Sequence, residues 1–188
     1  MRLFVALSLP KKERQRIHKE AATLRERGLP VRWVEPDHYH LTLKFLGEVR
    51  PDRVERIDGL LTKIARSNAP FPVEMGGFGA FPTIRRPRVI WLGVEPSPAL
   101  RCLKQDVEWA LAEIGFDRET RAFHPHLTLG RVDEEGGAGA FRGLDEVTAS
   151  MGYEASFEVK SLELMRSHLS RSGARYSVVA SRNLSDGS

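Results

Sequence analysis

The chain has 188 residues, 41% of them hydrophobic, which is enough to bury a substantial core. No apolar run approaches the length of a membrane span, and the N-terminal residues lack the cleavage site of a secretion signal, so we expect a cytoplasmic protein without membrane contact. The single cysteine excludes an internal disulfide, and the net charge of +4 suits a polyanionic partner but decides neither fold nor reaction.

Apolar runs punctuated by proline and glycine predict alternating strands and helices. In chain order, the first half is expected to form a strand at 3–9, a helix at 11–27, strands at 31–34 and 39–46, a helix that opens at Pro51, and a strand at 71–75. Residues 76–82 are too rich in glycine for a regular strand, so we expect a bulge or a loop rim there. The second half is expected to form a strand at 89–94, a helix at 98–114, a strand at 126–129, a weaker helix at 141–151, and strands at 157–164 and 176–180.

One short motif occurs twice. The sequence His-Leu-Thr-Leu stands at 40–43 and again at 126–129. Because side chains alternate between the two faces of a strand, His40 and Thr42 are expected on one face while Leu41 and Leu43 point into a core. If the two copies face each other across a cleft, two imidazoles and two hydroxyl groups converge on one small ligand.

The motif belongs to a longer internal repeat. The shift of 86 residues between the two histidines also relates strand 3–8 to strand 89–94, the proline at 10 to that at 96, and the phenylalanine at 71 to that at 157. We therefore expect an α+β fold of two pseudo-symmetric lobes, with antiparallel sheets flanking a central cleft and helices on the outside. The repeats are expected at about 1–86 and 87–182 of a single two-lobed domain, followed by a tail at 183–188. A parallel doubly wound sheet is disfavoured, because the motif strands follow other strands through short connections.

Two histidines and two threonines favour acid–base chemistry on a phosphoester. Imidazole titrates near neutrality, so His40 and His126 can divide the work of a general acid and a general base. Thr42 and Thr128 can donate to the non-bridging oxygens of a phosphate, which leaves the imidazoles for the attacking and departing oxygens.

The segments around the motifs resemble a known family. Residues 40–47 and 125–131, with segments 2–6, 79–82 and 87–91, resemble the two-histidine (2H) phosphoesterase superfamily, in the branch of RNA 2′,3′-cyclic phosphodiesterases once called 2′-5′ RNA ligases. The resemblance covers nearly the whole chain. It implies hydrolysis of a terminal 2′,3′-cyclic phosphate on RNA to a 2′-phosphate, without metal or other cofactor. It also implies the reverse reaction, which joins 2′-5′ ends.

The resemblance also implies roles and partners. His40 would protonate the departing 3′ oxygen and His126 would activate water, an order that the symmetric motif itself leaves open. The expected partner is RNA with a 2′,3′-cyclic phosphate end, for example tRNA fragments or small cyclic-phosphate nucleotides, and we expect a monomer.

Other residues are candidates for substrate binding. Arg131 resembles the family's arginine near the phosphate, but its strand parity is opposite to that of His126, so it reaches the site only through a bulge or a strand end. Lys44 shares the parity of His40 and is a candidate for phosphate binding, with a solvated lysine at the rim as the alternative. Further candidates for RNA contact, each with core packing or an exposed loop as the alternative, are Phe45, Phe81, Phe123, Arg85, Arg86 and Arg88.

Two other function classes stay open. His38 and His124 complete two His-x-His pairs, a pattern that also binds metal ions. A metal-dependent phosphohydrolase ranks lower because no Asp or Glu recurs beside both pairs, and the two extra histidines are expected to orient the catalytic pair or line the entrance. The third hypothesis is an RNA-binding module without catalytic activity.

Overall fold

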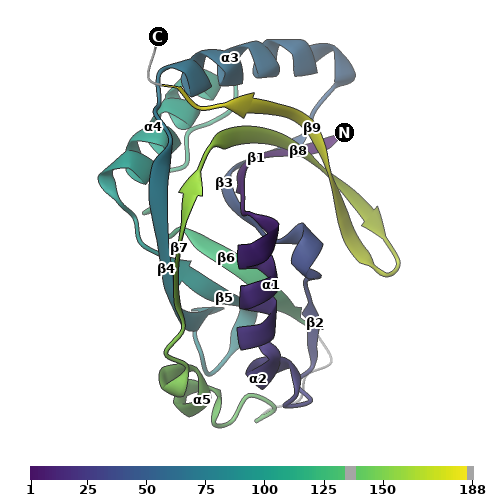
Figure 1. Cartoon of the computed structure of the whole chain (residues 1–188). Helices are drawn as coiled ribbons and strands as arrows, with labels where there is room; N and C mark the ends of the chain where they lie inside the picture. Colours follow the sequence, from purple (N-terminus) through teal and green to yellow (C-terminus); the bar gives the residue numbers. More distant parts are fainter. Residues whose placement is uncertain (134–138, 186–188) are drawn as a thin grey trace.

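Nine strands form one antiparallel sheet in the computed structural model, which describes residues 1–133 and 139–185 (Figure 1). They are β1 (Arg2–Ser8), β2 (Val31–Trp33), β3 (His40–Glu48), β4 (Phe71–Pro82), β5 (Pro87–Val94), β6 (His126–Val132), β7 (Glu154–Val159), β8 (Ser161–Ser170) and β9 (Gly173–Asn183). Their order across the sheet is β7-β4-β5-β6-β3-β1-β8-β9, and β2 pairs with β6.

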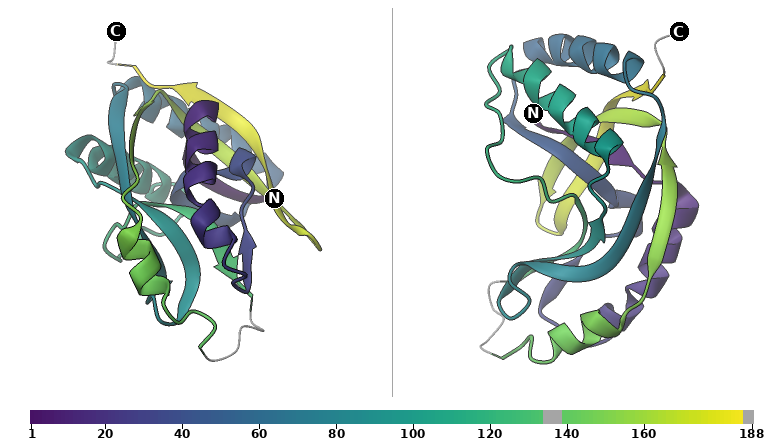
Figure 2. Two further views of the ribbon diagram at one scale, coloured as in Figure 1. Left: turned by 60° about the horizontal axis from the view of Figure 1, so that its bottom comes forward. Right: turned by 90° about the vertical axis from the view of Figure 1, so that its left-hand side faces the viewer.

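The helices lie outside the sheet. They are α1 (Lys11–Glu20), α2 (Ala22–Arg25), α3 (Val54–Arg66), α4 (Pro98–Ala112) and α5 (Leu144–Ser150), with 3₁₀ turns η1 (Pro36–His38) and η2 (Pro51–Arg53). Figures 1 and 2 show α3 and α4 together at one end of the molecule and α1, α2 and α5 toward the other. The α+β class with outer helices is confirmed. None of the described helices is long and apolar enough to cross a membrane.

Local sequence signals explain where the helices begin. The Ser97 hydroxyl accepts a hydrogen bond from the Leu100 N–H at 3.3 Å and so caps α4, and Pro98 occupies the first turn, where its missing N–H costs nothing. Pro51 opens η2, and α3 follows directly with Ile57 and Leu61 fully buried.

The two halves of the sequence exchange strands, a question that the sequence left open. β2 and β4 from the first half pair with β6 and β5 of the second, whereas β8 from the second half pairs with β1. Within the described residues, the pair Leu41 and Leu127 is the one register contact that joins β3 to β6 at the centre of the sheet. Each lobe is therefore built from both halves of the chain.

The register corrects the expected repeat by one residue. Ser8 lies opposite His40, and Gly93 lies opposite His126. From 8 to 93 is 85 residues, whereas from 40 to 126 is 86, so one extra residue lies in the connection between β5 and β6. The single shift of 86 residues therefore holds for the histidine strands but not for the strands that precede them.

Of two expectations for irregular segments, one is confirmed and one is wrong. The expected bulge at 76–82 is present, because the register of β4 breaks between Met75 and Phe78, where Gly77 adopts a φ of +78°, and the strand then continues to Pro82. The tail does not begin at Asn183, which ends β9. Leu184 is buried and its N–H donates to the Lys160 carbonyl at 2.8 Å. Residues 186–188 lie outside the described residues.

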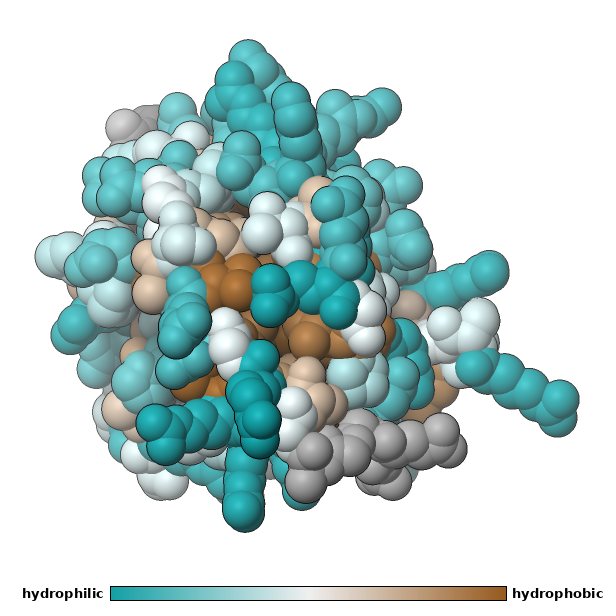
Figure 3. All heavy atoms as spheres, turned by 90° about the horizontal axis from the view of Figure 1, so that it is seen from below, coloured by the Kyte–Doolittle hydropathy of each residue, from teal (hydrophilic) through white to brown (hydrophobic). Residues whose placement is uncertain are grey.

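The sheet separates one large core from a small apolar cluster. The large core lies under the helices and includes Leu41 and Leu127. The small cluster lies around Phe4 and Met165, with Tyr176 packed against it. Figure 3 shows one end of the molecule, where hydrophobic atoms are visible between polar side chains.

Candidate active site

His40 and His126 occupy the first positions of adjacent strands, β3 and β6. Leu41 and Leu127 lie opposite each other and are 2% and 0% exposed. Because strand side chains alternate, both histidines and both motif threonines lie half-buried on the other side of the sheet. We call this side the histidine face, defined by His40, Thr42, His126 and Thr128.

A backbone carbonyl orients each imidazole in the same way. His40 Nδ1 lies 2.7 Å from the His38 carbonyl oxygen, and His126 Nδ1 lies 2.7 Å from the His124 carbonyl oxygen. A carbonyl oxygen only accepts, so Nδ1 carries the proton in both rings and Nε2 is left to exchange protons with a ligand. His38 and His124 thus orient the pair through their main chains.

Both imidazoles are neutral at neutral pH in the ligand-free protein. Burial lowers the pKa of His40 to about 4; the hydrogen bond to the His38 carbonyl opposes this shift, and the positive charge of Arg131 adds to it. Burial also lowers the pKa of His126, again with Arg131 acting in the same direction. An anionic ligand beside the rings would counteract both effects.

A β-bulge lies at the last residue of each histidine motif. In the β1–β3 pair, Ala6 lies opposite Thr42 but Val5 lies opposite Lys44, so Leu43 is an extra residue. Leu129 is extra in the same way in the β5–β6 pair, between Thr128 and Gly130. Each bulge reverses the alternation of the side chains that come after it.

The bulges decide where the two candidate cations lie. Lys44 turns away from the histidine face and is 7% exposed, with Nζ 2.7 Å from Glu108 Oε2 and 2.7 Å from the Asp117 carbonyl oxygen. The expectation that Lys44 shares a face with His40 is therefore wrong. Arg131, by contrast, is exposed and acts electrostatically on both histidines, so the bulge supplies the reversal that its parity required.

Aromatic rings flank the two histidines. The centroid of the His40 ring lies 4.9 Å from that of Phe4 and 5.0 Å from that of Tyr176. His126 meets Phe81 edge to face at 5.0 Å. Tyr176 was missed in the sequence because it lies in β9, outside both motifs, and nothing in the local pattern indicates which way the β8–β9 hairpin folds.

The other candidates occupy different environments. Phe45 is 66% exposed and lies 5.9 Å from Phe4, so it is a surface ring beside the histidine face. Phe123 packs against the core, with Lys104 Nζ 5.4 Å from its ring centroid. Arg85 and Arg86 in the β4–β5 turn and Arg88 at the start of β5 are exposed.

Among the described residues, no three His, Cys, Asp or Glu side chains lie close enough together to bind one metal ion. The His38 ring instead meets Tyr176 edge to face at 5.4 Å. The geometry thus offers two separate imidazoles rather than a coordination shell.

A family model matches the chain twice. The family described as LigT-like phosphoesterase matches residues 7–91 and again residues 92–176. The chain belongs to this family. The two matches fall on the two halves of the chain, in agreement with the internal duplication of the fold.

Curated relatives of this LigT-like phosphoesterase carry one name. A Methanothermobacter thermautotrophicus protein called RNA 2′,3′-cyclic phosphodiesterase is 33% identical over 172 residues, which cover 92% of this chain and 90% of the relative. An Aeropyrum pernix protein of the same name is 38% identical over 152 residues, which cover 79% of this chain and 84% of the relative.

Solved structures share the fold over its whole length. The protein TT0787 of Thermus thermophilus superposes with a TM-score of 0.82 at 26% identity, covering 98% of both chains. Escherichia coli LigT in complex with 3′-AMP superposes with a TM-score of 0.74 at 28% identity, covering 97% of both chains.

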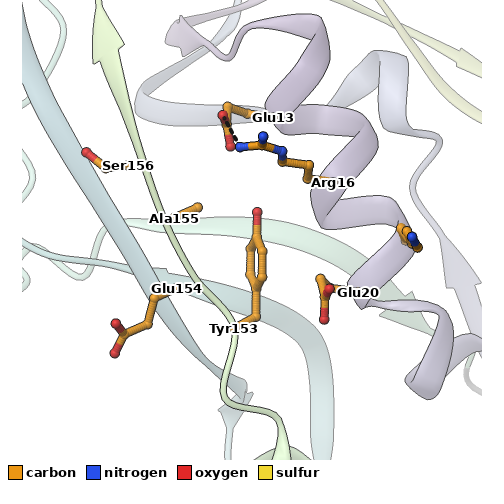
Figure 4. Close-up of a pocket in the computed structure, with 8 residues that line it drawn as sticks. Glu13, Arg16, Glu20, Tyr153, Glu154, Ala155 and Ser156 are labelled. Atoms are coloured by element: carbon orange, nitrogen blue, oxygen red, sulfur yellow. Dashed lines mark hydrogen bonds and ion pairs between the residues drawn. The ribbon is translucent and has the colours of Figure 1, made fainter.

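A separate cavity of this LigT-like phosphoesterase lies between α1 and β7 and has a volume of about 470 Å³ (Figure 4). Glu13 and Arg16 form an ion pair at 3.3 Å on one wall, and Tyr153 points toward them from the other. Glu13 Oε2 and the Tyr153 hydroxyl have no hydrogen-bond partner among the described residues. None of the sequence-predicted site residues lines this cavity.

Proposed function

We propose that this LigT-like phosphoesterase hydrolyses the 2′,3′-cyclic phosphate at the end of RNA to a 2′-phosphate. The relatives called RNA 2′,3′-cyclic phosphodiesterase support the substrate. The observation that carries the reaction type is the pair of imidazoles on one face, each with Nδ1 bound to a carbonyl and Nε2 left for proton transfer.

The two imidazoles supply the proton transfers of the reaction. His126 Nε2 accepts a proton from water as the water oxygen bonds to phosphorus. The bond from phosphorus to the 3′ oxygen breaks, and His40 Nε2 donates the proton that this oxygen requires. The water oxygen and one of its hydrogens thus become a P–OH group of the 2′-phosphate. The other water proton passes to His126, the 3′ hydroxyl receives its proton from His40, and the histidines exchange protonation states. Solvent restores them before the next turnover.

The remaining residues of the histidine face stabilise the phosphorane-like transition state. The hydroxyl groups of Thr42 and Thr128 donate to the non-bridging oxygens, and Arg131 offsets their charge. Carboxylates are not needed for this chemistry.

The site is asymmetric despite its internal repeat. The shift of 86 residues places Arg131 at the position that Phe45 occupies in the first copy. A cation stands on one side and an exposed ring on the other, so a nucleotide binds in one orientation and the two histidines take different roles. The assignment of the donor to His40 and of the acceptor to His126 follows the family resemblance.

The reverse reaction uses the same groups. A 2′-5′ bond forms without ATP when the hydroxyl of a second RNA end replaces water, because each proton transfer is reversible. Hydrolysis dominates since water is abundant. The tRNA-fragment substrates, the cytoplasmic location and the monomeric state stay predictions.

The test is the chemistry of the product. RNA ending in a 2′,3′-cyclic phosphate, incubated with the protein and excess chelator, is expected to acquire a 2′-phosphate end. His40→Ala and His126→Ala are each expected to lower kcat by about 10²–10⁴-fold while RNA binding persists. His124→Ala is the matched control, because its exposed ring is removed while its carbonyl still holds His126.

Three outcomes would contradict the proposal. Activity that chelator removes and zinc restores indicates a metallohydrolase. RNA binding without turnover by the unaltered protein indicates a binding module. A 3′-phosphate product indicates the opposite alignment of the cyclic phosphate between the histidines.

A further inference from the structure

A row of arginines leads away from the two histidines. It begins at Arg131 on β6, continues with Arg32 on the neighbouring strand β2, and ends at the tip of the β8–β9 hairpin with Arg171 and Arg175. We call these four residues the arginine strip. Of the four, only Arg131 adjoins a histidine motif in the sequence, and the other three lie in segments far apart in the chain.

Strand pairing places Arg32 beside Arg131. The two residues lie directly opposite each other in the antiparallel β2–β6 ladder, and opposite residues point to the same face. The neighbouring side chains, Val31 and Trp33, cover Gly130 on the core side of the sheet. Arg32 therefore shares the histidine face, and it is 64% exposed.

The hairpin tip, which carries the last two arginines, lies beside Arg32. A Cβ atom at Gly173 would lie 3.6 Å from Arg32 Cδ, and Gly173 has a φ of +117°, which favours glycine at this turn. Arg171 and Arg175 are both exposed and lie two residues before and after it. Figure 1 shows the tip near β2. Tyr176, three residues after Gly173 in β9, contacts His40, so the tip of the hairpin lies beside the histidine pair.

Among the described residues, the strip has more positive charge than its neighbours neutralise. Residues 165–181 contain no Asp or Glu. Within residues 1–133 and 139–185, Arg131, Arg171 and Arg175 form no ion pair, and Arg32 pairs only with Asp133 at 3.2 Å. Both side chains of this ion pair are exposed to solvent, so the interaction constrains Arg32 only weakly.

We propose that the arginine strip binds the backbone phosphates of single-stranded RNA on the 5′ side of the terminal cyclic phosphate. This inference rests on the proposed function, because the strip begins where the cyclic phosphate is bound. A polyanion is required to engage cations spaced along a path, and a mononucleotide reaches only the first of them. The enzyme therefore distinguishes an RNA chain from a free cyclic nucleotide by backbone contacts.

The experiment compares two substrates on one variant. The double variant Arg171→Gln/Arg175→Gln is assayed with a mononucleoside 2′,3′-cyclic phosphate and with a single-stranded oligoribonucleotide that ends in the same nucleotide. The matched control is Arg56→Gln/Arg66→Gln, which removes the same charge from exposed positions of α3. Fluorescence anisotropy of a labelled oligoribonucleotide measures binding without turnover.

The expected result is selective for the long substrate. At low salt, kcat/KM for the oligoribonucleotide falls by about tenfold for each arginine removed, as expected for charge-assisted contacts at a surface. The slope of log kcat/KM against log salt becomes shallower by about 1.4, from about 0.7 for each of the two lost phosphate contacts. Activity on the mononucleotide and on both substrates in the control variant stays unchanged.

Equal effects on both substrates, or an unchanged oligoribonucleotide, would overturn the inference. Failure of the proposed function has a different signature, because the unaltered protein would then turn over neither substrate. In that case, anisotropy still decides on the strip: RNA affinity that the double variant lowers and the control preserves supports it, and equal affinities reject it.

Discussion

A backbone carbonyl two residues before each histidine decides which ring nitrogen is free for proton transfer. Because the carbonyls of His38 and His124 occupy Nδ1, each neutral ring presents an unprotonated Nε2. Burial lowers the pKa of His40 to about 4, so the free protein holds this residue in the wrong protonation state for a general acid. A bound phosphodiester anion stabilises the imidazolium form of His40 and so raises its pKa.

We predict that inorganic phosphate raises the pKa of His40. Nuclear magnetic resonance of the imidazole protons should give a pKa near 4 in the free protein and a higher value at saturating phosphate. Since kcat/KM reports the free protein, its acidic limb should lie below the usual histidine range, whereas that of kcat should lie at higher pH. A pKa that stays unchanged while phosphate binds would contradict this view of the donor.

In β3 and β6, one extra residue decides on which face of the sheet the next charged side chain lies, Lys44 in β3 and Arg131 in β6. Leu43 and Leu129 form bulges at equivalent places, and each reverses the parity of the residues after it. Lys44 thereby enters the core side, where Glu108 Oε2 lies 2.7 Å away, while Arg131 arrives on the histidine face. Burial opposes ionisation of Glu108, but the hydrogen bonds from Lys104 and Lys44 outweigh it and lower its pKa.

We predict that Lys44→Met acts on stability rather than on substrate binding. Glu108 keeps Lys104 at 2.7 Å but loses its other buried cation, so the free energy of unfolding should fall by about 2–4 kcal/mol in urea titrations. Lys63→Met, at an exposed position of α3, is the control and should change it little. KM for a cyclic mononucleotide should stay unchanged in the folded variant. A raised KM without a loss of stability would indicate that Lys44 contributes to substrate binding.

At the scale of the whole molecule, the exchange of strands makes the two lobes one structural unit. β8 completes the sheet beside β1, and β4 completes it beside β5, so neither half of the sequence contains all the partners of its own strands. The two histidines sit on either side of the central pair Leu41 and Leu127, where the lobes join. The geometry of the site therefore depends on the integrity of both lobes.

We predict that unfolding is a single transition for both lobes. Leu164→Ala removes a fully buried side chain of β8 and should lower the free energy of unfolding by about 3 kcal/mol. In a Trp109→Phe background, tryptophan fluorescence reports Trp33 on β2 and Trp91 on β5, both in the other lobe. Its midpoint should be the same as that of circular dichroism. Leu169→Ala makes the same chemical change at a 71% exposed position and should have little effect. Two separate midpoints would show that the lobes unfold independently.

From the sequence alone, the duplication and the α+β class were predicted correctly, and His40 and His126 were identified as the candidate reactive pair. Local patterns carry this information, because strand alternation places His40 with Thr42 and the second copy repeats that placement. The N-cap at Ser97 and the buried stripes of the helices are local in the same sense.

Three features required the tertiary structure: which cation lies on the histidine face, which strands the halves exchange, and where the hairpin tip lies. A bulge depends on the partner strand, so the positions of Lys44 and Arg131 do not follow from periodicity. Pairing partners across the sheet depend on long-range packing, which brings Tyr176 to His40 and Gly173 to Arg32. The chain encodes its reactive pair locally, and the fold adds the contacts that give the pair its asymmetry.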